Sequence, residues 1–412
     1  MNVNFYQGKE DLVKDDEPSA SLDKIKQKIL DLSNVKNVHF LLGAGASSGA
    51  IPTMKEMVSS IDLKLSIPEP PKLPNSPDAK TPLRSSLKTL FEKIKSSTKS
   101  NLEDILGVLY SRRAYMIGSG EEASPQYTET TFLIEVIENE MFNQINIDFE
   151  TPNSQNSLAL YKDFYQKITL RNKDLSRVNI FTTNNDLFNE KALDYSNINY
   201  NNGFGGGLDR LFNPARFNYT FSRKIDAEVH KYEPLDNMVY LYKLHGSISW
   251  RESKTNSFFQ IQEVATKHSD EVPKDNILIY PTPLKQNKSL GAPYSDLIRE
   301  FQKKLLQPHS VLFVVGYSFS DEHLNNIIYQ ALASNSSISI VVFGNYADKE
   351  IFKVNDRRIY KIFGEVESEK IHYFKYIVDN FLPDLEEFED ISLLKNFISN
   401  LTAEKNGAKG TA

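Results

Sequence analysis

The chain has 412 residues, of which 40% are hydrophobic and 25% charged, and its formal net charge is −6 at pH 7. Neutralising phosphates takes a basic face, so this charge argues against direct nucleic-acid binding by this chain alone. The lack of cysteine excludes disulfides, thiol nucleophiles and cysteine-based metal sites. Residues 1–16 lack a signal-peptide pattern and no run of roughly 18 apolar residues occurs, so we expect a cytoplasmic protein without a membrane segment.

The first predicted elements are a helix and a buried strand. Residues 1–18 are polar and acidic, and we expect them to be disordered or loosely attached. Apolar residues at helical spacing between Leu22 and Leu32 predict a helix with Ser21 as its N-cap. The apolar run 38–42 predicts a strand that leads directly into a glycine-rich turn.

A mostly helical insertion is predicted over residues 60–172. Six of the 18 prolines fall within 68–82, which predicts a loop with polyproline character. Helical spacing then recurs in four stretches: 83–97, 100–117, 128–146 and 155–171. We expect this insertion to separate two strands of one sheet.

Short apolar segments that alternate with helical patterns predict a parallel sheet. The further predicted strands are 178–182, 239–244, 277–280, 310–315 and 338–343. Helices are expected to follow the first of these, up to Tyr195, and the fourth, over 321–333. The predicted fold class is therefore α/β, with a Rossmann-like, doubly wound parallel sheet.

Three parts of the chain are expected. Residues 1–35 form an N-terminal segment and helix, and 36–346 form the sheet domain with its insertion. Residues 347–412 add a short strand, two amphipathic helices over 350–402 and a polar tail over 403–412.

Two of the predicted strands end in residues able to bind a nucleotide. Open parallel sheets bind ligands at the carboxyl ends of their strands. Gly43-Ala44-Gly45-Ala46-Ser47 allows a tight turn that approaches a diphosphate, although Ser48 stands where a dinucleotide fingerprint has its third glycine. Thr182-Thr183-Asn184-Asn185-Asp186 forms a polar cluster able to hold a ribose. An ordinary βα turn and a helix cap are the respective alternatives.

Two later strands end in comparable motifs. Lys243-Leu244-His245-Gly246-Ser247 places a histidine at a strand terminus, where it can act as a general base or simply be hydrogen-bonded. Gly316-Tyr317-Ser318-Phe319-Ser320-Asp321 repeats the pattern of strand, glycine, hydroxyls and helix. Asn345, after the strand 338–343, can bind a second ribose or sit in a turn.

Together, in this order, the four motifs resemble the sirtuin-like NAD-binding family over about 36–346, and most closely the sirtuin-like proteins of bacterial antiviral defence. The Asn201-Asn202-Gly203-Phe204 segment, the Asn213-Pro214 loop and the compact length are similar to the partner of a HerA-type hexameric ATPase. The resemblance therefore implies a homo-oligomer and a complex with such an ATPase. No Walker-type G-x₄-G-K-[ST] loop occurs, so ATP hydrolysis is expected of the partner only.

The resemblance also implies roles for individual residues. Asn184 and Asp186 would hold the nicotinamide ribose, His245 would be the catalytic histidine, and Asn345 would bind the adenosine ribose. The residues implied in binding the rest of NAD are Gly43, Ala44, Gly45, Ser47, Thr183, Gly316 and Ser318. No metal is expected, because carboxylates and histidines show no ligand spacing.

The expected activity is hydrolysis of NAD at the nicotinamide–ribose bond, with Asn184, Asp186 and His245 as catalytic residues. Sirtuin deacylases carry a four-cysteine zinc module, which this chain lacks, and an Asp-Phe-Arg run where this chain has Thr53-Met54-Lys55. Removal of acyl groups from lysine is therefore disfavoured. The main alternative is a non-catalytic scaffold that senses NAD or ADP-ribose and regulates a partner ATPase or nuclease complex.

Overall fold

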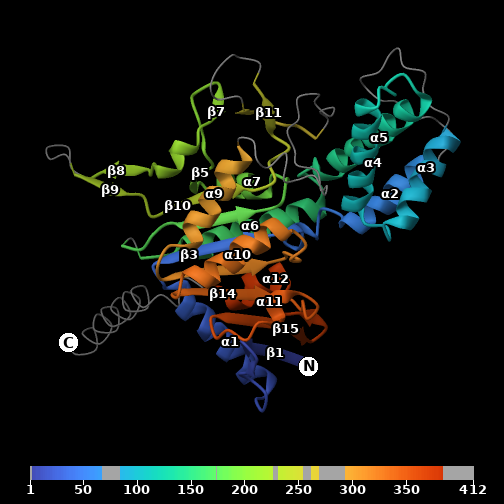
Figure 1. The fold of residues 1–412 in the computed structure, drawn as a ribbon. Helices are drawn as coiled ribbons and strands as arrows, with labels where there is room; N and C mark the ends of the chain where they lie inside the picture. Colours follow the sequence, from blue (N-terminus) through green and yellow to red (C-terminus); the bar gives the residue numbers. More distant parts are fainter. Residues whose placement is uncertain are drawn as a thin grey trace, which may run out of the picture.

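The computed structural model describes residues 2–66, 84–172, 174–225, 231–253, 261–268 and 293–383 (Figure 1). Three sequence predictions lie outside these residues: the proline-rich loop 68–82, the strand 277–280, and all that was expected after residue 383, including the tail. Within the described part, no helix is both long and apolar enough to cross a membrane.

A ten-stranded sheet forms the centre of the fold, in the order β2-β1-β15-β14-β13-β3-β4-β10-β5, with β16 paired to β15. Every pairing from β15 across to β5 is parallel, which confirms the predicted α/β class with a parallel-dominated sheet. The bounds of its strands are β1 Asn2–Gln7, β2 Glu10–Asp11, β3 Asn37–Leu42, β4 Val178–Thr182, β5 Asn199–Asn201, β10 Met238–Lys243, β13 Ser310–Val315, β14 Ile338–Phe343, β15 Ile359–Val366 and β16 Glu369–Lys370.

The order of the strands creates a switch point beside β3. From β3 the chain proceeds to β4, β5 and β10 on one side, and it later returns to β13, β14 and β15 on the other. The loops that leave β3 and β13 therefore diverge, although the two strands are direct neighbours. In open α/β sheets such a point is where ligands bind.

Helices cover both faces of the sheet, because alternate residues of each strand point to opposite sides. Phe40 and Leu42 pack against one set of helices, whereas Leu41 packs against the other. The first set is α1 Pro18–Ser33, α6 Pro152–Thr169, α7 Phe188–Tyr195, α12 Phe374–Tyr376 and the π turn Ile377–Phe381. The second is α9 Tyr294–Leu305, α10 Glu322–Ser334 and α11 Glu350–Lys353.

For residues 2–18, the prediction of disorder or loose attachment is wrong. Strand β1 pairs antiparallel with β15 along its whole length, and Phe5 is buried in the main core. The helix α1 begins at Pro18 after Glu17, and not at Ser21, which is buried within its first turn. Local composition could not reveal this pairing, because the partner strand lies some 350 residues further along the chain.

The predicted helical patterns of the insertion are confirmed, and four of its helices form a bundle beside the sheet (Figure 1). These are α2 Met54–Ser66, α3 Arg84–Ser97, α4 Leu102–Gly118 and α5 Pro125–Ile145, and they bury an apolar core of their own. The fifth helix, α6, instead covers the sheet, where Tyr161 and Phe164 contact Phe374. The insertion begins after β3 and ends before β4, and these two strands are neighbours in the sheet.

Short strands make up most of the described elements between α7 and α9. A small antiparallel sheet contains β6 Phe204–Gly205, β7 Arg210–Phe212, β11 Trp250–Glu252 and β12 Ile261–Glu263. A separate hairpin pairs β8 Ser222–Lys224 with β9 Tyr232–Pro234, and it extends away from the main sheet in Figure 1.

A histidine lies in the middle of the central strand. His39 is 0% exposed, and its Nδ1 lies 3.3 Å from Nδ2 of Asn179 on β4, while the Asn179 Oδ1 accepts from the Tyr242 hydroxyl. Burial lowers the pKa of His39 to about 3, with a smaller contribution from the positive charge of Lys304. The ring is therefore neutral in the folded protein across the physiological range.

This histidine should make the fold sensitive to acid. Its pKa is lower in the folded chain than the ordinary 6.5, so the unfolded chain takes up the proton first as the pH falls. Between pH 7.5 and 5 we expect His39 to remove about 2 kcal/mol from the free energy of unfolding. Urea unfolding of wild type and His39→Gln at both pH values measures this loss. An equal loss in the two proteins would contradict the assignment.

Candidate functional site

Two glycine turns meet at the switch point, one after β3 and one after β13. The amide of Gly43 donates to the carbonyl of Val315 at 2.9 Å, and that of Gly45 donates to the carbonyl of Gly316 at 3.0 Å. A Cβ on Gly43 would lie 2.5 Å from the Gly316 oxygen, and Gly316 adopts a φ of +65°. The backbones approach so closely that these positions require glycine. The first and fourth sequence motifs therefore form one structural unit.

A cavity of about 450 Å³ opens beside these turns, within the size range of small-molecule sites. The loops after β3, β4, β10 and β13 form its polar side, which contains Ala44, Gly45, Ser47, Thr183, Asn184, Asn185, Asp186, His245, Gly316, Tyr317, Ser318, Ser320 and Asp321. The insertion and the segment that leads into it form the other side, with Ile51, Pro52, Thr53, Met54, Lys55, Met57, Glu103, Met141 and Ile145.

Asn184, Ser47 and Asp186 form a buried hydrogen-bonded group at the cavity. The Asn184 amide donates to the Gly43 carbonyl and to the Ser47 Oγ, both at 3.1 Å. The Ser47 hydroxyl donates in turn to Asp186 Oδ2 at 2.9 Å. These contacts join the loop after β4 to the loop after β3, so the first two motifs are held in one fixed arrangement.

Asp186 is a buried carboxylate in this group, with 2% of its surface exposed. Its Oδ1 accepts from the backbone amide of Phe188 at 3.0 Å, at the start of α7. Burial raises the pKa of Asp186, while the positive charge of Lys243 and the two hydrogen bonds oppose that rise. A buried carboxyl group with a perturbed pKa at a cavity wall is a candidate functional group.

His245 reaches the cavity from the loop after β10, and 16% of its side chain is exposed. Its backbone carbonyl accepts from the Asn185 side chain at 2.7 Å, which holds the loop against the Thr182–Asp186 motif. Its Nε2 lies 3.1 Å from Oδ2 of Asp321, at the start of α10. The histidine is therefore held from two neighbouring loops.

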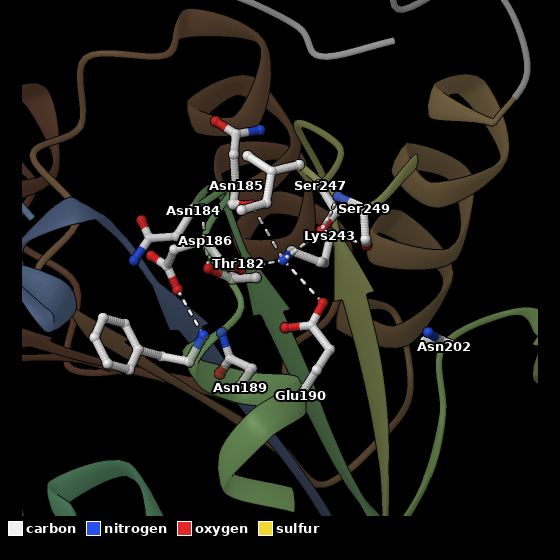
Figure 2. Close-up of polar contacts among 12 residues, drawn as sticks. Thr182, Asn184, Asn185, Asp186, Asn189, Glu190, Asn202, Lys243, Ser247 and Ser249 are labelled. Atoms are coloured by element: carbon white, nitrogen blue, oxygen red, sulfur yellow. Dashed lines mark hydrogen bonds and ion pairs between the residues drawn. The ribbon is translucent and has the colours of Figure 1, made fainter. Parts of the chain in front are cut away.

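A buried lysine lies beneath these loops (Figure 2). Lys243, with 1% of its side chain exposed, forms an ion pair of 2.9 Å with Glu190 on α7. Its ammonium group also donates to the Ser247 hydroxyl at 3.0 Å and to the backbone carbonyl of Asp186. Burial raises the pKa of Glu190, and the attraction to Lys243 opposes this. One cation thus connects the residues around Asp186 with those that follow His245.

The structure brings together nearly all the site residues predicted from the sequence. Those that line the cavity are Ala44, Gly45, Ser47, Thr183, Asn184, Asp186, His245, Gly316 and Ser318. Gly43 lies behind them, where its carbonyl accepts from Asn184. Asn345 follows β14 as predicted but is exposed, and it is not among the described residues of the cavity wall.

Sequence reasoning missed two kinds of contributor. Asp321 and Lys243 belong to the fourth and third motifs, and that position was the only signal for them in the sequence. Their contacts could not be inferred from it, because their partners come from distant parts of the chain. The apolar wall from Met57, Met141 and Ile145 carried no signal, since helical spacing does not indicate which face meets a ligand.

Two further observations bear on the choice of site. A larger hollow of about 720 Å³ lies at the amino ends of β5 and β10, and none of the motif residues is among those that line it. Across the described ranges, no cluster of three or more histidine, aspartate or glutamate side chains is arranged to hold a metal ion.

In a comparison with protein families, residues 178–350 match the model of the SIR2-like domain. The matched residues include the loops with Asn184, His245 and Gly316, whereas the first glycine turn lies before them. Comparison with curated proteins gives no match. The match supports a relationship to sirtuin-like proteins and an NAD-related activity in general.

Proposed function

We propose that this chain hydrolyses NAD to nicotinamide and ADP-ribose. The observation that carries this proposal is the cavity at the switch point, where Asn184, Asp186 and His245 meet two glycine turns. The match to the SIR2-like domain supports NAD as the substrate class. The absence of cysteine argues against the deacylase reaction, which in sirtuins is accompanied by a zinc module.

The reaction breaks the bond between the nicotinamide nitrogen and C1′ of the ribose. The electron pair of that bond leaves with nicotinamide, and a water oxygen bonds to C1′ as its proton passes to a base. Positive charge develops on the ribose in the transition state, so a nearby carboxylate lowers the barrier. Asp186 supplies that charge from the wall of the cavity, where Lys243 and the hydrogen bonds from Ser47 and Phe188 favour its ionised form against the effect of burial.

The other residues bind and orient the substrate. Ala44, Gly45, Gly316 and Ser318 line the part of the cavity that receives the diphosphate and the adjoining ribose. Asn184 fixes the nicotinamide ribose or the attacking water. His245 accepts a proton from that water or from a ribose hydroxyl, as a neutral imidazole can near pH 7.

In the cell, the proposed role is defence against phage by depletion of NAD. A permanently active hydrolase would deplete its own host, so activity requires a gate. We propose cytoplasmic homo-oligomers that assemble with a HerA-type ATPase, on the sequence resemblance described above. The four-helix bundle of the insertion is a candidate surface for that assembly, since it stands beside the sheet (Figure 1) and contributes to the cavity wall.

Chromatography of NAD incubated with the purified chain tests the proposal. We expect nicotinamide and ADP-ribose to form in equal amounts, although the reaction contains no acylated peptide. These products should come either from the chain alone or after addition of a HerA-type ATPase. NAD that binds but stays intact under both conditions would contradict the hydrolase. That result would favour the alternative of a scaffold that senses NAD or ADP-ribose.

A further inference from the structure

The carboxylate of Asp321 makes two separate sets of contacts. Its Oδ1 accepts from the backbone amides of His323 and Leu324, at 3.0 and 3.2 Å, and so caps α10. Its Oδ2 lies 3.1 Å from His245 Nε2, on the loop after β10. The cap leaves the second oxygen little freedom to move, because two amides of a regular helix fix the first.

The turn that carries Asp321 is itself held firmly. Phe319 is buried with a φ of +53°, a left-handed conformation that non-glycine residues rarely adopt. The Asn325 side chain donates to the Phe319 carbonyl at 3.0 Å, and the Tyr317 hydroxyl donates to the Asp321 carbonyl at 3.1 Å. Such a conformation persists only where its surroundings determine it, and it is frequent at functional sites.

We propose that Asp321 is a positioning residue that sets the orientation and tautomer of His245. The neutral imidazole then donates its Nε2 proton to Asp321 Oδ2, and Nδ1 becomes the nitrogen that accepts a proton in the reaction. The same logic underlies other catalytic histidines oriented by a buried carboxylate. The catalytic consequence rests on the proposed hydrolase, whereas the tautomer can be measured without any reaction.

Other titratable residues also line the cavity and face the same space. Three come from other parts of the chain, namely Lys55 of α2, Glu103 of α4 and Asp186 after β4, and the fourth is Tyr317 in the same turn as Asp321. Asp321 differs from them because its carboxylate contacts the His245 ring directly. The test therefore measures which ring nitrogen of His245 carries the proton, and it does not rely on the pH dependence of the rate alone.

Asp321→Asn separates the two roles of the carboxylate. The asparagine oxygen can still cap α10, but its amide group then faces Nε2 and donates to it, which moves the ring proton to Nδ1. Ring ¹⁵N shifts of His245, assigned with His245→Ala, should show Nε2–H in the wild type and Nδ1–H in Asp321→Asn. The kcat for NAD cleavage should fall by ~10²–10⁴-fold with little change in KM.

Asp321→Ser is the matched control for the cap, because serine also caps helices but is too short to reach His245. We expect its thermal unfolding to resemble that of wild type and its kcat to fall. A wild-type ring with its proton on Nδ1, or an unchanged kcat in Asp321→Asn, would overturn the positioning role. A wild-type chain that shows the Nε2–H tautomer but never cleaves NAD would contradict the hydrolase and leave the assigned geometry standing.

Discussion

Replacement of His245 by alanine is expected to lower the rate of NAD cleavage by ~10²–10⁴-fold, the usual contribution of a general base. The fold should survive, because the side chain is partly exposed at the cavity. The contact that holds this loop is made by the His245 backbone carbonyl, which accepts from Asn185 and is unchanged by the substitution. The turnover of purified wild type and variant, measured under the same conditions, checks this expectation.

A histidine at the far end of the sheet provides the control. His309 is exposed just before β13, with a φ of +51° that asparagine tolerates well. His309→Asn should therefore keep both the stability and the turnover of the wild type. Cleavage at the wild-type rate by a folded His245→Ala protein would show that this histidine is not the base.

Replacement of Lys243 by methionine is expected to lower the free energy of unfolding by ~3–5 kcal/mol, the cost of breaking a buried ion pair from one side. Methionine fills a similar volume, so the main loss is electrostatic. The Glu190 carboxylate and the Asp186 carbonyl oxygen would remain buried without the ammonium group that now contacts them. The loops on either side of the cavity would separate, so NAD binding should weaken as well.

A double substitution distinguishes the charge from the packing. Lys243→Met combined with Glu190→Gln removes both charges of the pair and should recover a large part of the lost stability. Urea unfolding of the wild type, both single variants and the double variant completes the thermodynamic cycle. Strictly additive effects of the two substitutions would contradict a coupled ion pair.

Local sequence patterns predicted most of the regular structure. The strands 38–42, 178–182, 310–315 and 338–343 and the helices α3 to α6 of the insertion were expected close to their observed bounds, whereas α2 was not predicted. Short apolar runs and helical spacing report burial of nearby residues, which is a property of the local chain. They do not report pairing across the sequence, and the antiparallel strand β1 was missed for that reason.

The predicted site shows the same difference between what local sequence patterns predict and what they do not. Glycine turns and polar residues directly after apolar strands could be read from the sequence, because a parallel sheet brings its strand ends to one edge. This reasoning placed Gly45, Asn184 and His245 at one cavity, as the structure does. It also assigned Asn345 to the site, whereas in the structure this residue is exposed after β14 and is not among the described residues of the cavity wall.

By itself, then, the sequence determined the class of fold and the four loops that form the polar side of the cavity, since both follow from local chemistry repeated along the chain. Only the tertiary structure decided which side chains meet across those loops. The His245–Asp321 contact and the Lys243–Glu190 ion pair join residues 76 and 53 positions apart. The apolar wall of the cavity comes from a helical bundle whose sequence is inserted between the neighbouring strands β3 and β4. These contacts depend on strand order and helix docking, which are set by packing of the whole core and not by any short segment.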